Sequence, residues 1–260
     1  MCGIAGCYGR NSIIISLALT LGQLERGTMG TGVAWCEKGK VYIYKRPINP
    51  IMFISKNINK LPRYPIVAIS HNRQPSIGKV SYVNTHPFMD CKRRFALIHN
   101  GSNHFVQTFR KEITKKHKIL GDTDSEIITH LLEQYYEEKN DMVEAIKTLM
   151  DTNVSGAILV LEKSGVLYGC RLGHEPLHYC TADKHVLLAS TKEAIRNLLD
   201  DEKDEIKALP RYAIIVVKKG DVEIIETEKT KIYKEYDLDY NLDYEIYYGL
   251  VKQNVYRWWF

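Results

Sequence analysis

The sequence predicts an α+β protein in which two β-sheets lie between layers of helices. Two observations carry this prediction. Short apolar runs of strand length recur along the chain, and segments in which apolar residues repeat with helical spacing lie between them. Because helices and sheets each bury an apolar face against another element, this mixture favours stacked layers around a shared core.

The first hundred residues predict mainly strands, with one early helix. Residues 2–8 indicate a strand that places its first residue at a sheet edge, and residues 13–24 have helical periodicity. Two apolar runs separated by a short turn predict a hairpin, at 32–35 and 41–45. Two further short strands each lead into a polar block, at 66–70 and 95–99. Loops that follow strands on a rigid scaffold are common places for binding residues.

The second half of the chain begins with two predicted helices, at 126–136 and 141–150, and Asp122 or Thr123 is a suitable N-cap for the first. Four apolar runs then predict strands, at 157–161, 166–170, 186–189 and 213–217. Helical spacing returns at 191–199, and the charged run at 200–205 predicts a solvated loop. This order supplies the second sheet and the outer helices.

Composition narrows the class of protein. A chain of 260 residues can bury one substantial core or at most two small ones. It is 45% hydrophobic, yet it contains no run of 18 apolar residues, and the apolar run at 13–21 fits a core helix better than a signal peptide. The net charge of +5 is spread along the chain without a basic block. These features predict a soluble, cytoplasmic protein with neither a membrane partner nor a nucleic-acid partner.

The six cysteines show no CxxC pair and no histidine at the spacing typical of zinc ligands. We therefore expect reduced thiols, no disulfide framework, no metal site and no cofactor.

Cys2 carries the strongest chemical signal, because it directly follows Met1. Removal of Met1 would leave a thiol and a free α-amine on one residue. Such an amine titrates near pH 8 and can accept a proton at working pH, and a thiolate is a strong nucleophile. If Met1 stays, the Cys2 nitrogen is an amide and cannot act as a base. A cysteine at position 2 by itself is common, so the prediction depends on the residues that follow.

Six sequence blocks occur in a recognisable order: MCGIAG at the start, RGTMGTG at 26–32, SHNRQPSIG at 70–78, VNTHPF at 83–88, LIHNGSN at 97–103 and GDTDSE at 121–126. Together they resemble the class II glutamine amidotransferases, which are N-terminal nucleophile hydrolases, and most of all the glutaminase domain of glucosamine-6-phosphate synthase. The resemblance covers roughly residues 2–220. It implies a four-layer αββα sandwich in a domain at 1–230, followed by an aromatic-rich extension at 231–260.

The resemblance implies a catalytic set. Cys2 matches the nucleophile that attacks the side-chain amide of glutamine, with its own α-amine as general base and then general acid. Asn100 and Gly101 match the oxyanion hole, through a side-chain amide and a backbone N–H. Two donors aimed at a developing oxyanion are what such a reaction needs, and glycine lets the backbone approach the substrate closely.

The resemblance also implies the residues that bind the substrate head. Arg73 matches the arginine that holds the α-carboxylate, and Asp124 matches the carboxylate that holds the α-ammonium. A planar guanidinium suits bidentate binding of a carboxylate. Ser76 stands where the family often has threonine, close to the bound amino acid. For Asp124 the alternative is that it only stabilises the first turn of a helix.

Four positions depart from the family pattern. Met29 and Gly30 replace the usual aspartate and serine, which puts the hydrogen bonding of that loop in question. Gln74 and Ile77 replace the tryptophan and histidine of the sugar-phosphate synthase. The last two changes argue against simple orthology with that synthase.

The expected reaction is hydrolysis of L-glutamine to glutamate and ammonia. Only some 30 to 40 residues follow the matched region, too few for an ammonia-consuming domain, so we expect the acceptor to be a synthase or transferase subunit on a separate chain. Trp258, Trp259 and Phe260 end the chain, and such an apolar cluster either folds back or docks on a partner. Two alternatives stay open: hydrolysis of another γ-glutamyl amide, and a non-catalytic glutamine-binding regulatory subunit.

Overall fold

The computed structural model describes residues 1–199, 201 and 203–232. Two antiparallel sheets form the centre of this part of the chain. The first sheet has seven strands, in the order β11 (Lys207–Ala208), β9 (His178–Ala182), β10 (His185–Ala189), β1 (Gly3–Tyr8), β4 (Val67–Asn72), β2 (Thr31–Glu37) and β3 (Lys40–Arg46). The second sheet has six, in the order β13 (Asp221–Ile225), β12 (Ile214–Lys218), β8 (Leu167–Arg171), β7 (Ala157–Glu162), β6 (Phe95–Asn100) and β5 (Phe88–Met89).

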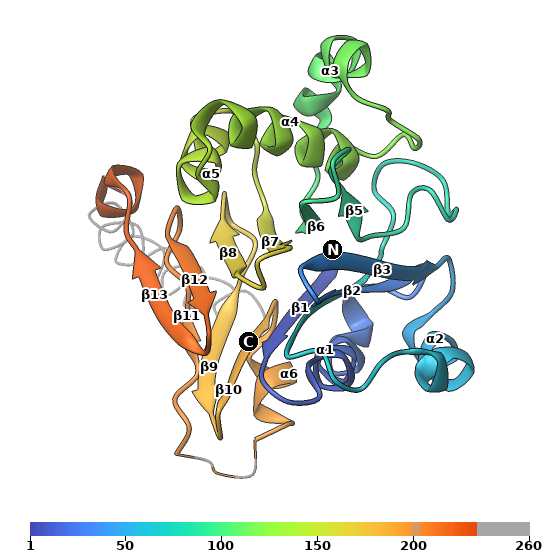
Figure 1. Cartoon of the computed structure of the whole chain (residues 1–260), viewed down its shortest axis with the longest axis vertical. Coiled ribbons are helices and arrows are strands. Elements are labelled where there is room, and N and C mark those ends of the chain that lie inside the picture. Colours follow the sequence, from blue (N-terminus) through green and yellow to red (C-terminus); the bar gives the residue numbers. More distant parts are fainter. Residues whose placement is uncertain (200, 202, 233–260) are drawn as a thin grey trace, which may run out of the picture.

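Helices cover the outer face of each sheet (Figure 1). Against the first sheet lie α1 (Ser12–Leu21), α2 (Pro50–Asn57) and α6 (Lys192–Arg196). Over the second sheet lie α4 (Asp124–Lys139) and α5 (Met142–Met150), and α3 (Arg110–Lys116) precedes α4. Short 3₁₀ helices lie at Leu24–Arg26, Ile58–Lys60 and His104–Phe109. The predicted αββα order of layers is therefore confirmed.

The layers follow from alternation of side chains along the strands. In β1, Ile4 packs between the two sheets, whereas Ala5 and Cys7 pack on the helical side. In β6, Ile98 faces the inter-sheet core and Leu97 faces α4 and α5. Because successive strand residues point to opposite faces, a strand that is apolar at every position can bury both faces. Burial of such side chains contributes roughly 1.5–3 kcal/mol each.

Most of the predicted elements are confirmed within one to three residues, and one needs a correction. The first strand was expected to place its first residue at a sheet edge, but β1 is the central strand of its sheet, paired with β10 on one side and β4 on the other. Cys2 thus lies at the end of an interior strand. An apolar strand without polar alternation is typical of such a doubly covered position.

The remaining predictions concern the carboxyl-terminal part. The charged segment predicted as a loop contains no helix or strand at the described residues 201 and 203–205. The domain boundary at 230 stays a prediction, and Trp258, Trp259 and Phe260 lie outside the described residues, as does the extension from residue 233 on. In the described part of the chain, no helix is both long enough and apolar enough to cross a membrane.

Candidate active site

Cys2 lies where the ends of three strands come together. It directly precedes β1, and the antiparallel register places Gly3 opposite Asn72 at the end of β4. A Cβ at Gly3 would collide with the Asn72 side chain, so glycine is needed for this close pairing. From the facing sheet, β6 ends at Asn100. The start of β1 and the ends of β4 and β6 thereby meet near the chain terminus marked N in Figure 1.

Cys2 is 8% exposed and contacts polar groups with its nitrogen, its sulfur and its carbonyl oxygen. Its N–H donates to Asn100 Oδ1 at 3.0 Å. Its thiol lies 3.4 Å from both the backbone oxygen and the backbone nitrogen of Gln74. Arg26 Nε donates to the Cys2 carbonyl at 2.9 Å. These contacts fix the position of the residue while Met1, which is 72% exposed, still precedes it.

Burial raises the pKa of the Cys2 thiol above its ordinary value. The hydrogen bond from Gln74, the terminal ammonium and the Arg73 guanidinium oppose this rise, whereas the Asp124 carboxylate adds to it. The thiol is therefore mostly protonated at neutral pH and needs a base to become a nucleophile. Arg73 and Asp124 are also close enough to act on it electrostatically.

Arg73 directly follows β4 and holds the next loop. Its Nη1 donates to the Lys79 carbonyl at 2.9 Å, and its Nη2 donates to the carbonyls of Ile77 and Gly78 at 2.8 and 3.0 Å. A guanidinium has five N–H donors, so two remain for another acceptor. Ser76 lies in the same loop and is exposed.

Asp124 is the first residue of α4, and Thr123 is its N-cap, through a side chain that accepts from Glu126 N at 3.3 Å. Asp124 is 4% exposed, and its Oδ2 accepts from Asn103 N at 2.7 Å. Its Oδ1 accepts from Ser125 N at 2.9 Å. The carboxylate thus holds the loop that follows Asn100, which goes beyond stabilising its own helix.

Glu175 joins this group, although the sequence gives no signal for it. Its Oε2 accepts from Asn100 Nδ2 at 3.2 Å and lies 3.5 Å from Arg26 Nη2. Arg26 belongs to one of the recognised blocks, but its contact with the Cys2 carbonyl requires the folded chain. Asn100 is therefore held at both ends of its amide, by Cys2 N and by Glu175.

Gly101 follows Asn100 in a narrow space. A Cβ there would lie 2.5 Å from His99 Nε2 and 3.0 Å from Gly156 Cα. The His99 ring is itself fixed, because its nitrogens lie 3.0 Å from Ser125 Oγ and 3.0 Å from the Ser155 carbonyl. This arrangement leaves no room for a side chain at position 101.

The departure at Met29 and Gly30 leaves a loop held by its backbone. Met29 N donates to the Arg73 carbonyl at 2.9 Å, and Arg73 N donates to the Gly30 carbonyl at 2.8 Å. A Cβ at Gly27 would lie 2.5 Å from the Arg73 carbonyl carbon. The loop therefore positions Arg73 without the aspartate and serine side chains that are usual there.

For the glutamine hydrolysis that the sequence predicts, we expect Met29→Ala to change kcat/KM by no more than about twofold, because the Met29 side chain is 46% exposed and its contact with Arg73 is through the backbone. Gly27→Ala is the matched variant, and its new Cβ should displace Arg73 and raise KM at least about tenfold. Steady-state kinetics of both variants test the loop. Equal losses in the two would contradict positioning through the backbone.

Comparison with known proteins shows the family of this chain. The family model described as "Glutamine amidotransferases class-II" matches residues 1–167, more than half of the chain. The chain therefore belongs to the class II glutamine amidotransferases.

Curated relatives include glutamine–fructose-6-phosphate aminotransferases (isomerizing). The protein of Chlamydia muridarum is 29% identical over an alignment of 240 residues that covers 90% of this chain and 39% of the relative. That of Pyrococcus horikoshii is 32% identical over an alignment of 164 residues that covers 62% of this chain and 27% of the relative. The chain thus spans between about a quarter and two fifths of these relatives.

Solved structures show the same fold at low identity. Glutamine phosphoribosylpyrophosphate amidotransferase from B. subtilis aligns with a TM-score of 0.73 and 17% identity, over 86% of this chain and 49% of that one. A glutamine aminotransferase class-II domain protein from Silicibacter pomeroyi aligns with a TM-score of 0.58 and 16% identity, over 86% of this chain and 98% of that one. The αββα architecture of the described residues is accordingly the fold of these two proteins.

Proposed function

We propose that this chain, once Met1 has been removed, hydrolyses the side-chain amide of L-glutamine to glutamate and ammonia. The observation that carries the proposal is the 3.0 Å contact between Cys2 N and Asn100 Oδ1. It places the nitrogen that becomes the α-amine, the thiol on the same residue and a side-chain amide in one buried site. A nucleophile, a base and a hydrogen-bond donor are then within reach of one substrate carbonyl.

The reaction proceeds in two halves. The α-amine takes the thiol proton, and Sγ attacks the amide carbon to form a tetrahedral oxyanion. Asn100 Nδ2 and the Gly101 N–H stabilise that oxyanion, with Nδ2 turning from Glu175 to the substrate. The protonated α-amine of Cys2 then gives its proton to the leaving nitrogen, and ammonia departs. Water attacks the resulting γ-glutamyl thioester, which releases glutamate and restores the thiol.

Arg73 and Asp124 recognise the amino-acid head of the substrate in this proposal. An N–H of Arg73 that its loop contacts leave unused binds the α-carboxylate, and Asp124 binds the α-ammonium while keeping its contact with Asn103. Ser76, in the loop held by Arg73, lies beside the bound amino acid. The charges of Arg73 and Asp124 both affect the pKa of the Cys2 thiol. This supports one site that binds the α-amino-acid group and the side-chain amide of the substrate together.

We further propose that the ammonia is delivered to an acceptor site on a separate synthase or transferase subunit. The chain matches about a quarter to two fifths of relatives that are named glutamine–fructose-6-phosphate aminotransferases, which supports an acceptor for the ammonia. Free ammonia is protonated and dilutes in water, so a docked acceptor would use it more efficiently. The cytoplasm is the compartment in which a Cys2 thiol stays reduced.

A panel of γ-glutamyl amides tests the choice of substrate. The purified chain should release glutamate fastest from glutamine, whereas a site that recognises only the α-amino-acid group through Arg73 and Asp124 would accept any γ-glutamyl amide. A strong preference for a bulkier γ-glutamyl amide would mean that this amide, and not glutamine, is the substrate. Glutamine binding by calorimetry without turnover, in the presence and absence of cell extract, would instead indicate a regulatory subunit that binds glutamine.

A further inference from the structure

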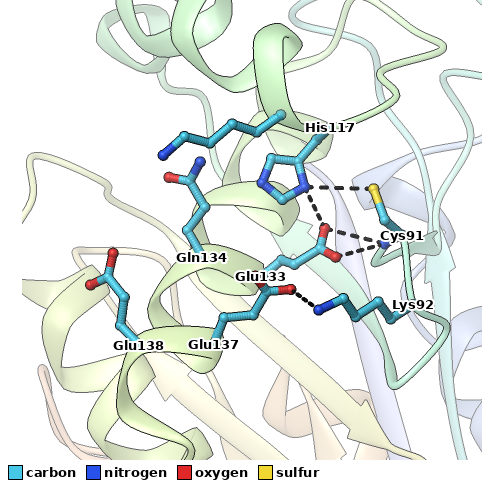
Figure 2. Close-up of a pocket in the computed structure, with 8 residues that line it drawn as sticks. Cys91, Lys92, His117, Glu133, Gln134, Glu137 and Glu138 are labelled. Atoms are coloured by element: carbon cyan, nitrogen blue, oxygen red, sulfur yellow. Dashed lines mark hydrogen bonds and ion pairs between the residues drawn. The ribbon is translucent and has the colours of Figure 1, made fainter.

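A second cluster of reactive side chains lies away from Cys2, on the helical side of the second sheet. Cys91 lies in the turn between β5 and β6, His117 directly follows α3, and His130 and Glu133 lie on successive turns of α4. Three of them, Cys91, His117 and Glu133, line one side of a cavity of about 350 Å³ that is also lined by charged residues of α4 (Figure 2). Among the described residues, these four form a group that could hold a metal ion.

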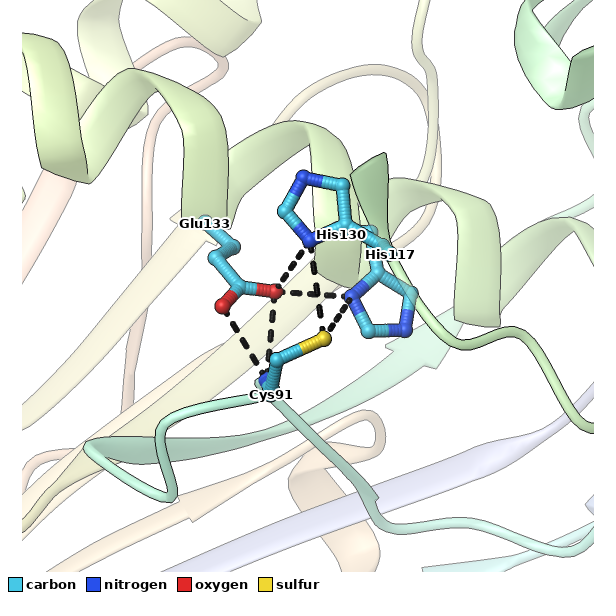
Figure 3. A group of neighbouring side chains, drawn as sticks. All are labelled: Cys91, His117, His130 and Glu133. Carbon is cyan, nitrogen blue, oxygen red and sulfur yellow. Dashed lines mark hydrogen bonds and ion pairs between the residues drawn. The ribbon is translucent and has the colours of Figure 1, made fainter. Parts of the chain in front are cut away.

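Their potential ligand atoms converge, as Figure 3 shows. Glu133 Oε2 lies 2.9 Å from His117 Nδ1 and 2.8 Å from His130 Nδ1. Cys91 Sγ lies 3.5 Å from His117 Nδ1 and 3.8 Å from His130 Nδ1. All four atoms lie within 4.8 Å of one another. Tetrahedral zinc requires separations of about 3.3 Å between nitrogen or oxygen ligands and about 3.5 Å between sulfur and nitrogen. The four separations between Glu133 or Cys91 and the two histidines are within roughly 0.5 Å of these values.

Hydrogen bonds alone explain only part of the arrangement. Each histidine Nδ1 faces both Glu133 Oε2 and Cys91 Sγ, and an imidazole nitrogen carries at most one hydrogen. A thiol hydrogen can be donated only to an Nδ1 that has none. Linear hydrogen bonds can therefore account for two of the four contacts, whereas a cation at the centre accounts for all four.

The surroundings orient Glu133 as a ligand. Cys91 N donates to both of its carboxylate oxygens, at 3.1 Å to Oε1 and 3.2 Å to Oε2, and Oε1 also lies 3.5 Å from Arg94 Nη2. Oε2 is thereby turned toward the two histidines. Arg94 is held in turn by Asp90, whose Oδ2 accepts from Arg94 Nε at 2.7 Å. Hydrogen bonding of the second ligand oxygen is the usual way in which proteins fix a metal-binding carboxylate.

We propose that Cys91, His117, His130 and Glu133 bind one Zn²⁺ ion in a tetrahedral structural site. The mixed nitrogen, sulfur and oxygen donors suit zinc, and four protein ligands leave no position open for catalysis. The ion ties the end of α3 and the β5–β6 turn to α4, the helix that starts at Asp124. It would thus stabilise the segment that leads into the candidate active site.

This proposal differs from the expectation, drawn from cysteine and histidine spacing, that the chain has no metal site. Cys91, His117 and His130 lie on three segments separated by 26 and 13 residues. Only His130 and Glu133 form a local pair, three residues apart on one helix face. Folding brings the other two to that face, so no compact ligand motif exists in the sequence.

Metal binding by the full chain tests the proposal. After chelation and desalting, the wild type should bind one equivalent of Zn²⁺, and Co²⁺ in its place should give the visible bands of tetrahedral cobalt with a sulfur charge-transfer band. Cys91→Ser should abolish the charge-transfer band and weaken Zn²⁺ binding at least about tenfold. Cys36→Ser is the matched control, because Cys36 is a half-buried thiol outside the cluster, and it should retain both.

Two more variants separate this site from other causes. Cys2→Ala should keep the cobalt spectrum, since Cys2 is outside the cluster, and His117→Ala should lose it. Far-ultraviolet circular dichroism shows whether each variant is folded, and Zn²⁺ should raise the Tm of wild type but not of Cys91→Ser. Absence of stoichiometric binding to the folded wild type, or an unchanged cobalt spectrum in folded Cys91→Ser, would overturn the proposal and leave a hydrogen-bonded cluster.

Discussion

Cys2→Ala is expected to lower glutamate release from glutamine by about 10⁴-fold or more, because it removes the nucleophile on which both halves of the reaction depend. Cys36→Ala is the control that removes a thiol outside the site. Coupled measurement of glutamate release, together with the intact mass of each protein, checks the result and shows whether Met1 has been removed. Substantial activity in folded Cys2→Ala would refute covalent catalysis by Cys2.

A second variant isolates the role of the α-amine. A chain in which an inserted residue prevents removal of Met1 keeps the Cys2 thiol but leaves the Cys2 nitrogen as an amide, so the rate of glutamate release should fall about 10²- to 10⁴-fold. In the mature chain, kcat/KM should rise with pH as the ammonium loses its proton near pH 8. The sign follows because only the neutral amine can accept the thiol proton. A blocked chain as active as the mature one would exclude the amine as base.

Asn100→Asp is expected to lower kcat about 10²- to 10³-fold, with a smaller change in KM. The substitution keeps an oxygen acceptor for Cys2 N, but it replaces the donor Nδ2 with a second oxygen. That oxygen would face Glu175 Oε2, which now lies 3.2 Å from Nδ2, and the two carboxylates would repel each other. Steady-state kinetics and thermal unfolding measure the two effects separately.

A double variant distinguishes these effects. Adding Glu175→Gln to Asn100→Asp removes the repulsion and restores a hydrogen bond, so the Tm should return toward the wild-type value. If Asn100 Nδ2 stabilises the oxyanion, kcat should stay low, because the donor is still missing. Recovery of kcat in the double variant would show that Asn100 acts by positioning and not as an oxyanion donor.

Part of this site could be predicted because its residues lie in short, ordered blocks. Cys2, Arg73, Asn100 and Asp124 each follow or precede a predicted strand or helix, and the structure places them on adjoining ends of those elements. Glu175 could not be predicted. It contacts Asn100, which is 75 residues away in sequence, and nothing local in its segment indicates a role.

Some helices and strands were not predicted from the sequence, for different reasons. Helix α2 has a local signal, since Asn49 caps it by accepting from Met52 N at 2.8 Å and proline follows at position 50, but it is short. Strand β9 is only partly buried and mixes polar with apolar residues, and it is stabilised by pairing with β10 on one side and β11 on the other. Strand β13 likewise depends on its pairing with β12.

The sequence by itself determined the class of fold, the order of most strands and helices, and the family, because periodicity and ordered motifs are local properties of the chain. Only the tertiary structure decided that β1 is a central strand, that Glu175 holds Asn100, and that Cys91 meets two histidines beside Glu133. The reason is physical: each of these depends on which segments pack together, and the free energy of that packing is shared among residues far apart in the chain.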